Sequence, residues 1–430
     1  MDHHAVTYTD TVEWLFGLQF FGIKLGLDNI TSMAARWGNP HRAFPVVHIA
    51  GTNGKGSTAS FIAAALTAAG YRTGLYTSPH LEDFTERIRI DGAAISSDDV
   101  VRYAAALRPE VERLNATFFE ITTLMAFQYF ADNRVDVAVI ETGMGGRLDA
   151  TNIVVPACSV ITGVALDHTE YLGSSIEAIA FEKAGIIKRG VPVVSGTADV
   201  TAARVIADRA AALGAPLVPV FWQGRAEWTD FDRMCCELGG MEYPVVLGLV
   251  GEHQARNAAL SLAALHRLKE AGFDQLTDEV LRDGFRNVRS YSGLRGRLHR
   301  LASDPELVVD AGHNPEGLRV MLDAWCALRS PAATHAVFGV MKSKDHHEMI
   351  REIATRGFAS VTFVQATAHD AQPMEALLDA AARQGLEARS ADTVHRGVEA
   401  AFERAHDGSA LLFGSHYVLG EYFRAMREHG

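Results

Sequence analysis

The chain has few cysteines, no excess of basic residues and no long hydrophobic run. Its four cysteines are scattered and form no CxxC pair, which favours a reducing, cytoplasmic location over a disulfide framework. Lysine plus arginine number 40 against 52 acidic residues, and a net charge of −12 disfavours binding to nucleic acid. No run approaches the ~18–20 apolar residues of a membrane span, and residues 1–4 do not resemble a signal peptide. We therefore expect neither a nucleic-acid nor a membrane partner.

What the chain does contain is enough apolar sequence for a large core. Its 430 residues are 48% hydrophobic and 21% charged, which excludes a disordered or coiled-coil protein. Apolar strand-like runs alternate with alanine-rich helical stretches. That alternation predicts an α/β fold, a parallel sheet with helices on both faces. The expected strands of the first part are 45–50, 75–77, 135–140, 160–162 and 191–194, and the expected helices are 58–69, one capped at 96–98 and limited by Pro109, and 121–131.

The alternation is interrupted near the middle of the chain. Short β-like pieces over 217–250 precede helices expected at 254–270 and 277–288, and a polar, glycine-containing segment follows at 290–296. We place a domain boundary there, which divides the chain into residues 1–292 and 293–430. Alternation then restarts, with strands expected at 307–309, 336–338, 361–364 and 410–413. The sequence therefore predicts a second, smaller α/β domain.

A glycine-rich string lies between the strand at 45–50 and the helix that follows. It reads Gly51-Thr52-Asn53-Gly54-Lys55-Gly56-Ser57-Thr58. Glycines allow successive N–H groups to face one anion, and the helix N-terminus adds its dipole. Lys55 can reach terminal phosphates, and the Ser57 or Thr58 hydroxyl can bind Mg²⁺. The spacing departs from G-x-x-x-x-G-K-[ST], so a glycine turn with an incidental lysine is the alternative, but the strand–loop–helix context favours a phosphate loop.

Three further groups of the first domain have both a chemical and a structural interpretation. Glu141 ends an apolar strand, where a carboxylate can hold Mg²⁺, orient a water or simply be solvated. His168 follows another strand as a metal ligand, a proton carrier or a surface histidine. Lys183 stands before Gly185, where a lysine in the last turn of a helix needs no functional explanation.

The second domain has polar clusters after three of its expected strands. These clusters are 310–315, 342–345 and 414–417. The carboxyl ends of parallel strands share one edge of a sheet. We therefore expect one edge of the second sheet to face a ligand.

Several strings, taken in order, resemble the folylpolyglutamate synthase and dihydrofolate synthase family of the Mur-ligase superfamily. They are residues 22–27, 48–57, 77–81, 145–152, 166–168 and 182–186. Two positions depart from the family pattern. The order Ala311-Gly312 replaces the usual Gly-Ala after Asp310, and Arg295 stands where the family's linker commonly has proline before Gly296-Arg297.

The resemblance implies an N-terminal P-loop ATPase domain of Mur-ligase type with a parallel sheet and a smaller C-terminal Rossmann-like domain. It implies a cytoplasmic, monomeric ligase that uses ATP to join L-glutamate to dihydropteroate and to reduced folates through an acyl phosphate. Mg²⁺ is the implied metal, with K⁺ left open as a second ion. The implied ATP-binding residues are Gly51, Thr52, Asn53, Gly54, Lys55, Gly56, Ser57, Thr58, Asn257, Arg297 and Asp310. The implied Mg²⁺ ligands are Ser57, Ser78, Glu141 and His168.

The resemblance also assigns catalysis and substrate binding. The implied catalytic residues are Lys55, His168, Lys183 and His313, with Lys183 modified by CO₂ to a carbamate. Glutamate would contact His313 and Ser415. The pterin would meet Thr117, Phe118, Phe119, Glu120, Leu148, Asp149 and Ala150. A phenylalanine could stack on the pterin ring while the glutamate accepts its N–H groups. The alternative is that both phenylalanines are core and Glu120 is a charge at a helix N-terminus.

Three rival functions remain open from the sequence. One is a folylpolyglutamate synthase that does not add glutamate to dihydropteroate. A second is a Mur-type ligase for a cell-wall UDP precursor, although only about 45 residues precede the phosphate loop, too few for an added UDP-binding domain. A third is a nucleotide-dependent switch that needs neither glutamate nor folate.

Overall fold

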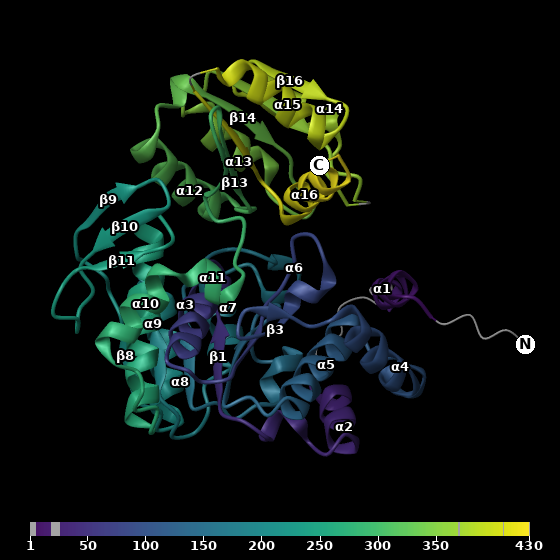
Figure 1. The fold of residues 1–430 in the computed structure, drawn as a ribbon, viewed down its shortest axis with the longest axis vertical. Helices are drawn as coiled ribbons and strands as arrows, with labels where there is room; N and C mark the ends of the chain where they lie inside the picture. Colours follow the sequence, from purple (N-terminus) through teal and green to yellow (C-terminus); the bar gives the residue numbers. More distant parts are fainter. Residues whose placement is uncertain (1–5, 19–25, 369, 407, 430) are drawn as a thin grey trace, which may run out of the picture.

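The computed structural model describes residues 6–18, 26–368, 370–406 and 408–429. Residues 22–25 of the first family-like string lie outside these ranges. Figure 1 shows two lobes, which we call the N-terminal lobe (α1 to α11) and the C-terminal lobe (β12 to α16). The predicted boundary at 292/293 coincides with the end of α11 (Val288–Ser292), and it stays a prediction.

The N-terminal lobe is built on an eight-stranded sheet in the order β4-β3-β2-β5-β1-β6-β7-β8, within the described residues. Central β1 pairs in parallel with β5 on one side and β6 on the other. At one edge, β3 pairs antiparallel with β2, and β4 pairs antiparallel with β3, so among the described strands β3 alone runs against the rest. The strands are β1 (Val46–Ala50), β2 (Thr73–Tyr76), β3 (Ile88–Ile90), β4 (Ala93–Ala94), β5 (Val137–Glu141), β6 (Cys158–Ile161), β7 (Val193–Ser195) and β8 (Leu217–Pro219).

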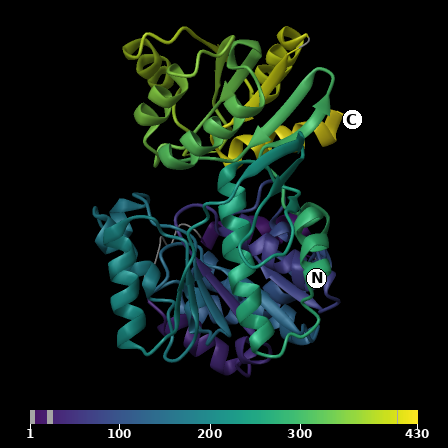
Figure 2. The same cartoon turned by 90° about the vertical axis from the view of Figure 1, so that its left-hand side faces the viewer.

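Helices cover both faces of this sheet, as the alternation predicted (Figures 1 and 2). They are α1 (Tyr8–Gly17), α2 (Asp28–Arg36), α3 (Lys55–Ala68), α4 (Ser97–Leu114), α5 (Phe118–Asp132), α6 (Thr169–Leu172), α7 (Ile176–Ala184), α8 (Val200–Ala212), α9 (Glu252–Glu270), α10 (Asp278–Arg286) and α11. Alanine-rich α3 packs closely against α10. A Cβ at Gly284 of α10 would lie 2.6 Å from Ala65 Cα, so small residues permit this contact.

The expectation that Pro109 limits its helix is wrong. Helix α4 continues through Pro109 to Leu114. Proline removes one N–H from the helix, and the exposure of Pro109 and of Ala105, the residue four positions earlier, lets water replace the lost hydrogen bond.

A small antiparallel sheet projects from the N-terminal lobe beside the C-terminal lobe (Figure 1). Its strands are β9 (Ala226–Asp230), β10 (Arg233–Cys236) and β11 (Val245–Leu247). Phe231, in its tight turn, is buried and lies with its ring 6.3 Å from that of Trp325 in the C-terminal lobe. The guanidinium groups of Arg300 and Arg329 each lie 5.0 Å from the Phe231 ring. The small sheet therefore joins the cores of the two lobes.

The C-terminal lobe contains a second sheet in the order β12-β13-β17-β14-β15-β16, in which only edge strand β12 is antiparallel. Its strands are β12 (His299–Ser303), β13 (Glu306–Asp310), β14 (Thr334–Phe338), β15 (Ser360–Val364), β16 (Ala388–Ala391) and β17 (Ser409–Phe413). Its helices are α12 (Pro315–Leu328), α13 (His346–Ala354), α14 (Met374–Arg383), α15 (Val394–Ala405) and α16 (His416–His429). Within the described ranges, no helix combines the length and apolarity needed to cross a membrane.

Candidate functional site

The phosphate-loop string bridges β1 and α3, as predicted. Gly54, just before α3, has a left-handed backbone with φ of 85°. A Cβ there would also lie 2.5 Å from Asn257 Oδ1, so both conformation and space require glycine. The loop is tied to the residues after β6 because Thr162 Oγ1 donates to Asn53 O at 2.6 Å.

Lys55 begins α3 and folds back onto its own loop. Its Nζ donates to Gly51 O at 3.0 Å and to Thr52 O at 3.1 Å. Thr52 is held in turn, since its Oγ1 accepts from Ala165 N at 3.0 Å. The ammonium group is therefore preorganised at the helix N-terminus, where an anion binds favourably.

A cavity of about 130 Å³ lies beside the phosphate loop and collects most of the predicted chemical groups. Because β5, β1 and β6 are neighbours in the sheet, their carboxyl ends deliver Glu141, the loop and the segment containing His168 to one place. The predicted residues that line this cavity are Gly51, Thr52, Asn53, Gly54, Lys55, Gly56, Ser57, Ser78, Glu141, His168, Lys183, Arg297 and His313.

Glu141 is a buried carboxyl group, only 4% exposed. It accepts a hydrogen bond from Ser78 N at 3.3 Å. Burial raises the pKa of Glu141 to about 7, against the opposing effect of Lys55. A cation at this cavity would favour the charged carboxylate.

The donor set around Glu141 suits Mg²⁺. Within the described residues, histidine, cysteine and acidic side chains form no group of three or more that could hold a metal ion without other ligands. Glu141, Ser57 and Ser78 supply oxygens, and Mg²⁺ commonly combines one or two carboxylates with substrate phosphates and water. His168 has φ of 50° and a side chain 42% exposed, so its ring is open to the cavity. These residues fit Mg²⁺ together with a bound phosphate.

Lys183 lies near the end of α7 and is 3% exposed. Burial, with a further contribution from the Lys55 charge, lowers the pKa of Lys183 to about 7. The adjoining glycine-rich loop packs tightly on this helix, since a Cβ at Gly146 would lie 3.0 Å from Lys183 O. Arg147 and Glu182 form a salt bridge of 2.9 Å across the same contact. The two family-like strings at 145–152 and 182–186 are therefore packed against each other.

Asp310 ends β13 and is buried. Its carboxylate accepts from Leu298 N at 2.8 Å and from Gly312 N at 2.7 Å. Burial raises the pKa of Asp310. Asp310 thus holds the linker that carries Arg297, and both residues line a cavity of about 1030 Å³ between the lobes, together with the predicted Asn257.

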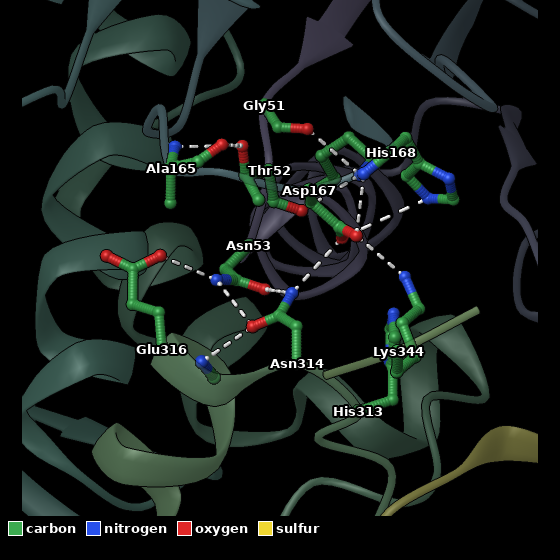
Figure 3. Close-up of polar contacts among 12 residues, drawn as sticks. Gly51, Thr52, Asn53, Ala165, Asp167, His168, His313, Asn314, Glu316 and Lys344 are labelled. Atoms are coloured by element: carbon green, nitrogen blue, oxygen red, sulfur yellow. Dashed lines mark hydrogen bonds and ion pairs between the residues drawn. The ribbon is translucent and has the colours of Figure 1, made fainter. Parts of the chain in front are cut away.

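Polar side chains connect the phosphate loop to the facing lobe (Figure 3). Asn314 Nδ2 donates to Asn53 Oδ1 at 2.9 Å, and Asn53 Nδ2 donates to Glu316 Oε2 at 2.8 Å. Lys344 Nζ lies 2.8 Å from Asp167 Oδ1. Burial acts to raise the pKa of Asp167, but the charge and hydrogen bond of Lys344, together with His168 and His313, hold that pKa well below its usual range. The carboxyl edges of the two sheets therefore face each other across the large cavity.

The predicted pterin residues at 117–120 line neither cavity. Glu120 Oε2 accepts from Thr117 N at 2.7 Å and from Thr117 Oγ1 at 2.9 Å, which closes a capping box at the start of α5. Phe118 is buried, with its ring 5.5 Å from that of Phe16. Phe119 is only partly buried and packs against Gly143, which lines the small cavity. The geometry favours the structural alternative for Thr117, Phe118 and Glu120.

Other predicted substrate residues also make structural contacts and do not line the cavities. Asp149 is buried, accepts from Met144 N at 2.9 Å, and caps the short helix that begins at Ala150; Leu148 precedes it. Ser415 is 1% exposed and accepts from Tyr417 N at 3.1 Å.

Reasoning from sequence passed over four residues of the site. Asp167 directly precedes the predicted His168, and Asn314, Lys344 and His416 lie in the three polar clusters predicted after strands of the second domain. The positions of the predicted strands showed where these polar segments lie. They did not show which side chain of a segment faces the cavity, because side chains in a loop do not alternate between two faces as they do in a strand.

Two family models match the chain. The Mur ligase middle domain matches residues 49–265 and the Mur ligase glutamate ligase domain matches residues 296–416. A Bacillus subtilis dihydrofolate synthase/folylpolyglutamate synthase is 36% identical over 84% of this chain and 86% of its own length. A Lacticaseibacillus casei folylpolyglutamate synthase is 34% identical over 96% of this chain and 97% of its own length.

Solved structures agree with these matches. Mycobacterium tuberculosis folylpolyglutamate synthase, complexed with ADP and AMPPCP, superposes with a TM-score of 0.88 at 31% identity and covers 97% of this chain and 98% of its own. Escherichia coli FolC, in complex with DHPP and ADP, gives a TM-score of 0.83 at 31% identity, with the same coverage. The predicted fold class, two α/β units of Mur-ligase type, is confirmed, and the chain belongs to the Mur ligases, within the dihydrofolate synthase/folylpolyglutamate synthase family.

Proposed function

We propose that this chain is an ATP-dependent ligase that adds L-glutamate to dihydropteroate and to reduced folates. The main support is that the phosphate loop, Lys55, Glu141 and Lys183 line one cavity, opposite the strand ends of the C-terminal lobe. A carboxylate is a poor acyl donor, so the reaction first needs phosphoryl transfer. The carboxylate oxygen attacks the γ-phosphorus of ATP, and ADP leaves an acyl phosphate behind.

Phosphate binding falls to the start of α3. Backbone N–H groups of the loop and the Lys55 ammonium group face the phosphates, and the ammonium exchanges its contacts with Gly51 O and Thr52 O for phosphate oxygens. Glu141, Ser57, Ser78 and His168 would hold Mg²⁺, which when bound offsets the charge that develops on the transferred phosphoryl group. K⁺ stays a prediction, as does the monomeric state.

The second step needs a base for the glutamate amine. His313 Nδ1 lies 3.0 Å from Ala311 O, and a carbonyl only accepts, so this nitrogen carries the hydrogen and Nε2 keeps its lone pair. Burial lowers the pKa of His313 to about 4, which keeps the ring neutral. The amine nitrogen attacks the acyl carbon and phosphate leaves; His313 Nε2 would accept a hydrogen bond from the attacking amine, and the amine proton passes to the departing phosphate, since a pKa of about 4 makes the ring a weak base.

Lys183 is proposed to be carbamylated. A neutral lysine amine adds CO₂, forms a C–N bond and releases a proton, so a cation becomes an anion. The buried amine with a pKa of about 7 supplies the neutral form. Its place in the cavity of Glu141 and Lys55 puts the new anion beside the metal and the cationic loop.

The relatives named for both activities support use of both acceptors. The direct experiment is mass spectrometry of products formed with ATP, L-glutamate, and either dihydropteroate or tetrahydrofolate. We expect one added glutamate on dihydropteroate and glutamate addition to tetrahydrofolate. Addition to tetrahydrofolate alone would reduce the proposal to a folylpolyglutamate synthase, and addition to neither would refute it.

A further inference from the structure

The linker between the lobes carries an arginine that holds the loop after Ser78. Arg295 Nη2 lies 2.6 Å from Glu86 Oε1, and its Nη1 lies 3.2 Å from Glu82 Oε2. The side chain of Arg295 is 31% exposed, whereas those of Glu82 and Glu86 are 11% and 15% exposed. The pairs are thus shielded from water more than ordinary surface ion pairs, which contribute little.

Glu86 also sets the backbone of that loop. Its carboxylate accepts from the N–H groups of Leu81, Glu82 and Asp83, each at 3.1 Å. These residues directly follow Ser78-Pro79-His80, and Ser78 N donates to Glu141. A guanidinium group on Glu86 therefore acts on the short segment that leads to Ser78.

The C-terminal lobe rests on the same loop through α16. The Arg295 guanidinium lies 4.6 Å from the ring of Phe423. Arg427 Nη1 lies 3.1 Å from Glu82 Oε1. A Cβ at Gly420 would lie 1.9 Å from Leu81 O, so the helix and the loop are in direct contact. Arg295 is therefore placed where the linker, α16 and the Ser78 loop meet.

The next two linker residues, Gly296 and Arg297, connect Arg295 to the cavities. Gly296 has φ of +67°, and a Cβ there would lie 3.0 Å from Leu419 of α16 and 3.2 Å from Leu81. Arg297, the next residue, lines both cavities. A shift at Arg295 would thus move the Ser78 loop on one side and Arg297 on the other.

We propose that Arg295 is a positioning residue that couples the seating of the C-terminal lobe to the placement of Ser78 at the metal and phosphate site. This inference rests on the proposed function. A proline, common at this position in the family, would restrict the linker backbone but supply no guanidinium group. Here a side chain fixes the linker to the loop through Glu82 and Glu86.

The test compares Arg295→Met, which keeps an apolar stem on Phe423 but removes both ion pairs, with Arg427→Met. Arg427 also pairs with Glu82, but its side chain is 66% exposed and, among the described residues, it forms no ion pair with Glu86, so it is the matched control. For Arg295→Met we expect an increase of about tenfold in the Mg²⁺ concentration at half-maximal rate and in the KM for ATP, with saturated kcat within about twofold of wild type. Arg295→Lys should recover part of the shift, and Arg427→Met should behave as wild type.

Unchanged Mg²⁺ and ATP dependence in a folded Arg295→Met protein would overturn the inference, as would a loss of kcat and thermal stability without those shifts. If Arg295→Met does not fold, Glu82→Gln, which leaves the Glu86 bonds intact, is measured in its place and should show a smaller shift of the same kind; no shift would count against the inference. Wild-type protein without glutamate-dependent turnover would instead refute the proposed function.

Discussion

Lys183 and Glu141 are buried groups of opposite sign, and the pKa of each lies at about 7 in the folded protein. Burial disfavours the charged form of both, so it lowers the lysine pKa and raises the carboxyl pKa. Each therefore changes protonation near neutral pH, where the proposed function has the amine react with CO₂ and the carboxylate bind Mg²⁺.

For Lys183 we expect carbamate formation to increase with pH between about 6 and 8, because only the neutral amine reacts with CO₂. The measurement is ¹³C NMR of the protein with labelled bicarbonate, alongside activity in CO₂-depleted buffer. Lys183→Ala should lose the carbamate signal and about 10²–10³-fold in kcat, the size of effect seen when one stabilising group is removed from an active site. Added short carboxylates should partly restore the activity of Lys183→Ala.

Lys188 is the matched control for that measurement. It is a partly buried lysine in the loop that follows α7, and its Nζ donates to Asn152 O at 2.9 Å outside the small cavity. A carbamate signal that survives Lys183→Ala and vanishes in Lys188→Ala would contradict the assignment.

For Glu141 the pH dependence concerns metal binding and stability. Because folding raises its pKa from 4.5 to about 7, its contribution to stability is complete below pH 4.5 and is lost as pH rises through 7. Mg²⁺ held by this carboxylate would compete with the proton, so apparent Mg²⁺ affinity should rise about tenfold from pH 6 to pH 8. Thermal shift with added Mg²⁺ measures this, and a shift of equal size at both pH values, or one that persists in Glu141→Gln, would argue against the site.

At the scale of elements, helix α5 shows how a local role can explain a residue that resemblance assigns to substrate. The Glu120 carboxylate closes the capping box with Thr117, whereas Phe119 lies partly exposed beside the cavity wall. One helix turn thus contains both a structural residue and a candidate acceptor contact.

We predict that Glu120→Ala lowers the free energy of unfolding by about 1–2 kcal/mol and lowers activity with dihydropteroate and with tetrahydrofolate equally. Phe119→Ala should raise the KM for dihydropteroate more than that for tetrahydrofolate. Denaturant unfolding and steady-state kinetics on both acceptors separate the two. A selective loss of dihydropteroate use in Glu120→Ala would restore Glu120 to the substrate site.

The elements found from sequence are those with strong local signals. Buried strands β1, β5, β13 and β17 read as continuous apolar runs, and the glycine-rich loop marks the start of α3. Edge strands β12 and β16 were not predicted, because their residues are polar or half-exposed and each strand pairs on one side only. Likewise, the predicted strand ends showed where the site lies. Which polar side chains enter it, Lys344 and Asn314 but not Ser415, depends on how the two lobes face each other, and the sequence does not show that.

At the scale of the whole molecule, the two lobes share more than the substrate cavity. Phe231, from the small sheet, is held between Arg300 and Arg329 and beside Trp325. This contact is remote in sequence from the phosphate loop and involves none of the residues that contact Arg295. It provides a second fixed point between the lobes.

Phe231→Ala should therefore uncouple the lobes. We expect a loss of about 3–4 kcal/mol in the free energy of unfolding and separate unfolding transitions, because a buried aromatic ring is lost at the junction of two cores. Phe221→Ala is the control, since Phe221 is 58% exposed. Denaturant unfolding followed by tryptophan fluorescence and circular dichroism tests this, and coincident transitions at the wild-type midpoint in Phe231→Ala would contradict it.

If this chain consumes ATP to join glutamate to a pterin-containing acid, ADP release by the purified protein should depend on every substrate. We expect release only when ATP, L-glutamate and dihydropteroate or tetrahydrofolate are all present, at one ADP per glutamate added, and a loss of about 10²–10³-fold in folded Lys55→Ala with either acceptor. Sustained ADP release that is independent of glutamate, or near-normal turnover of Lys55→Ala, would contradict it.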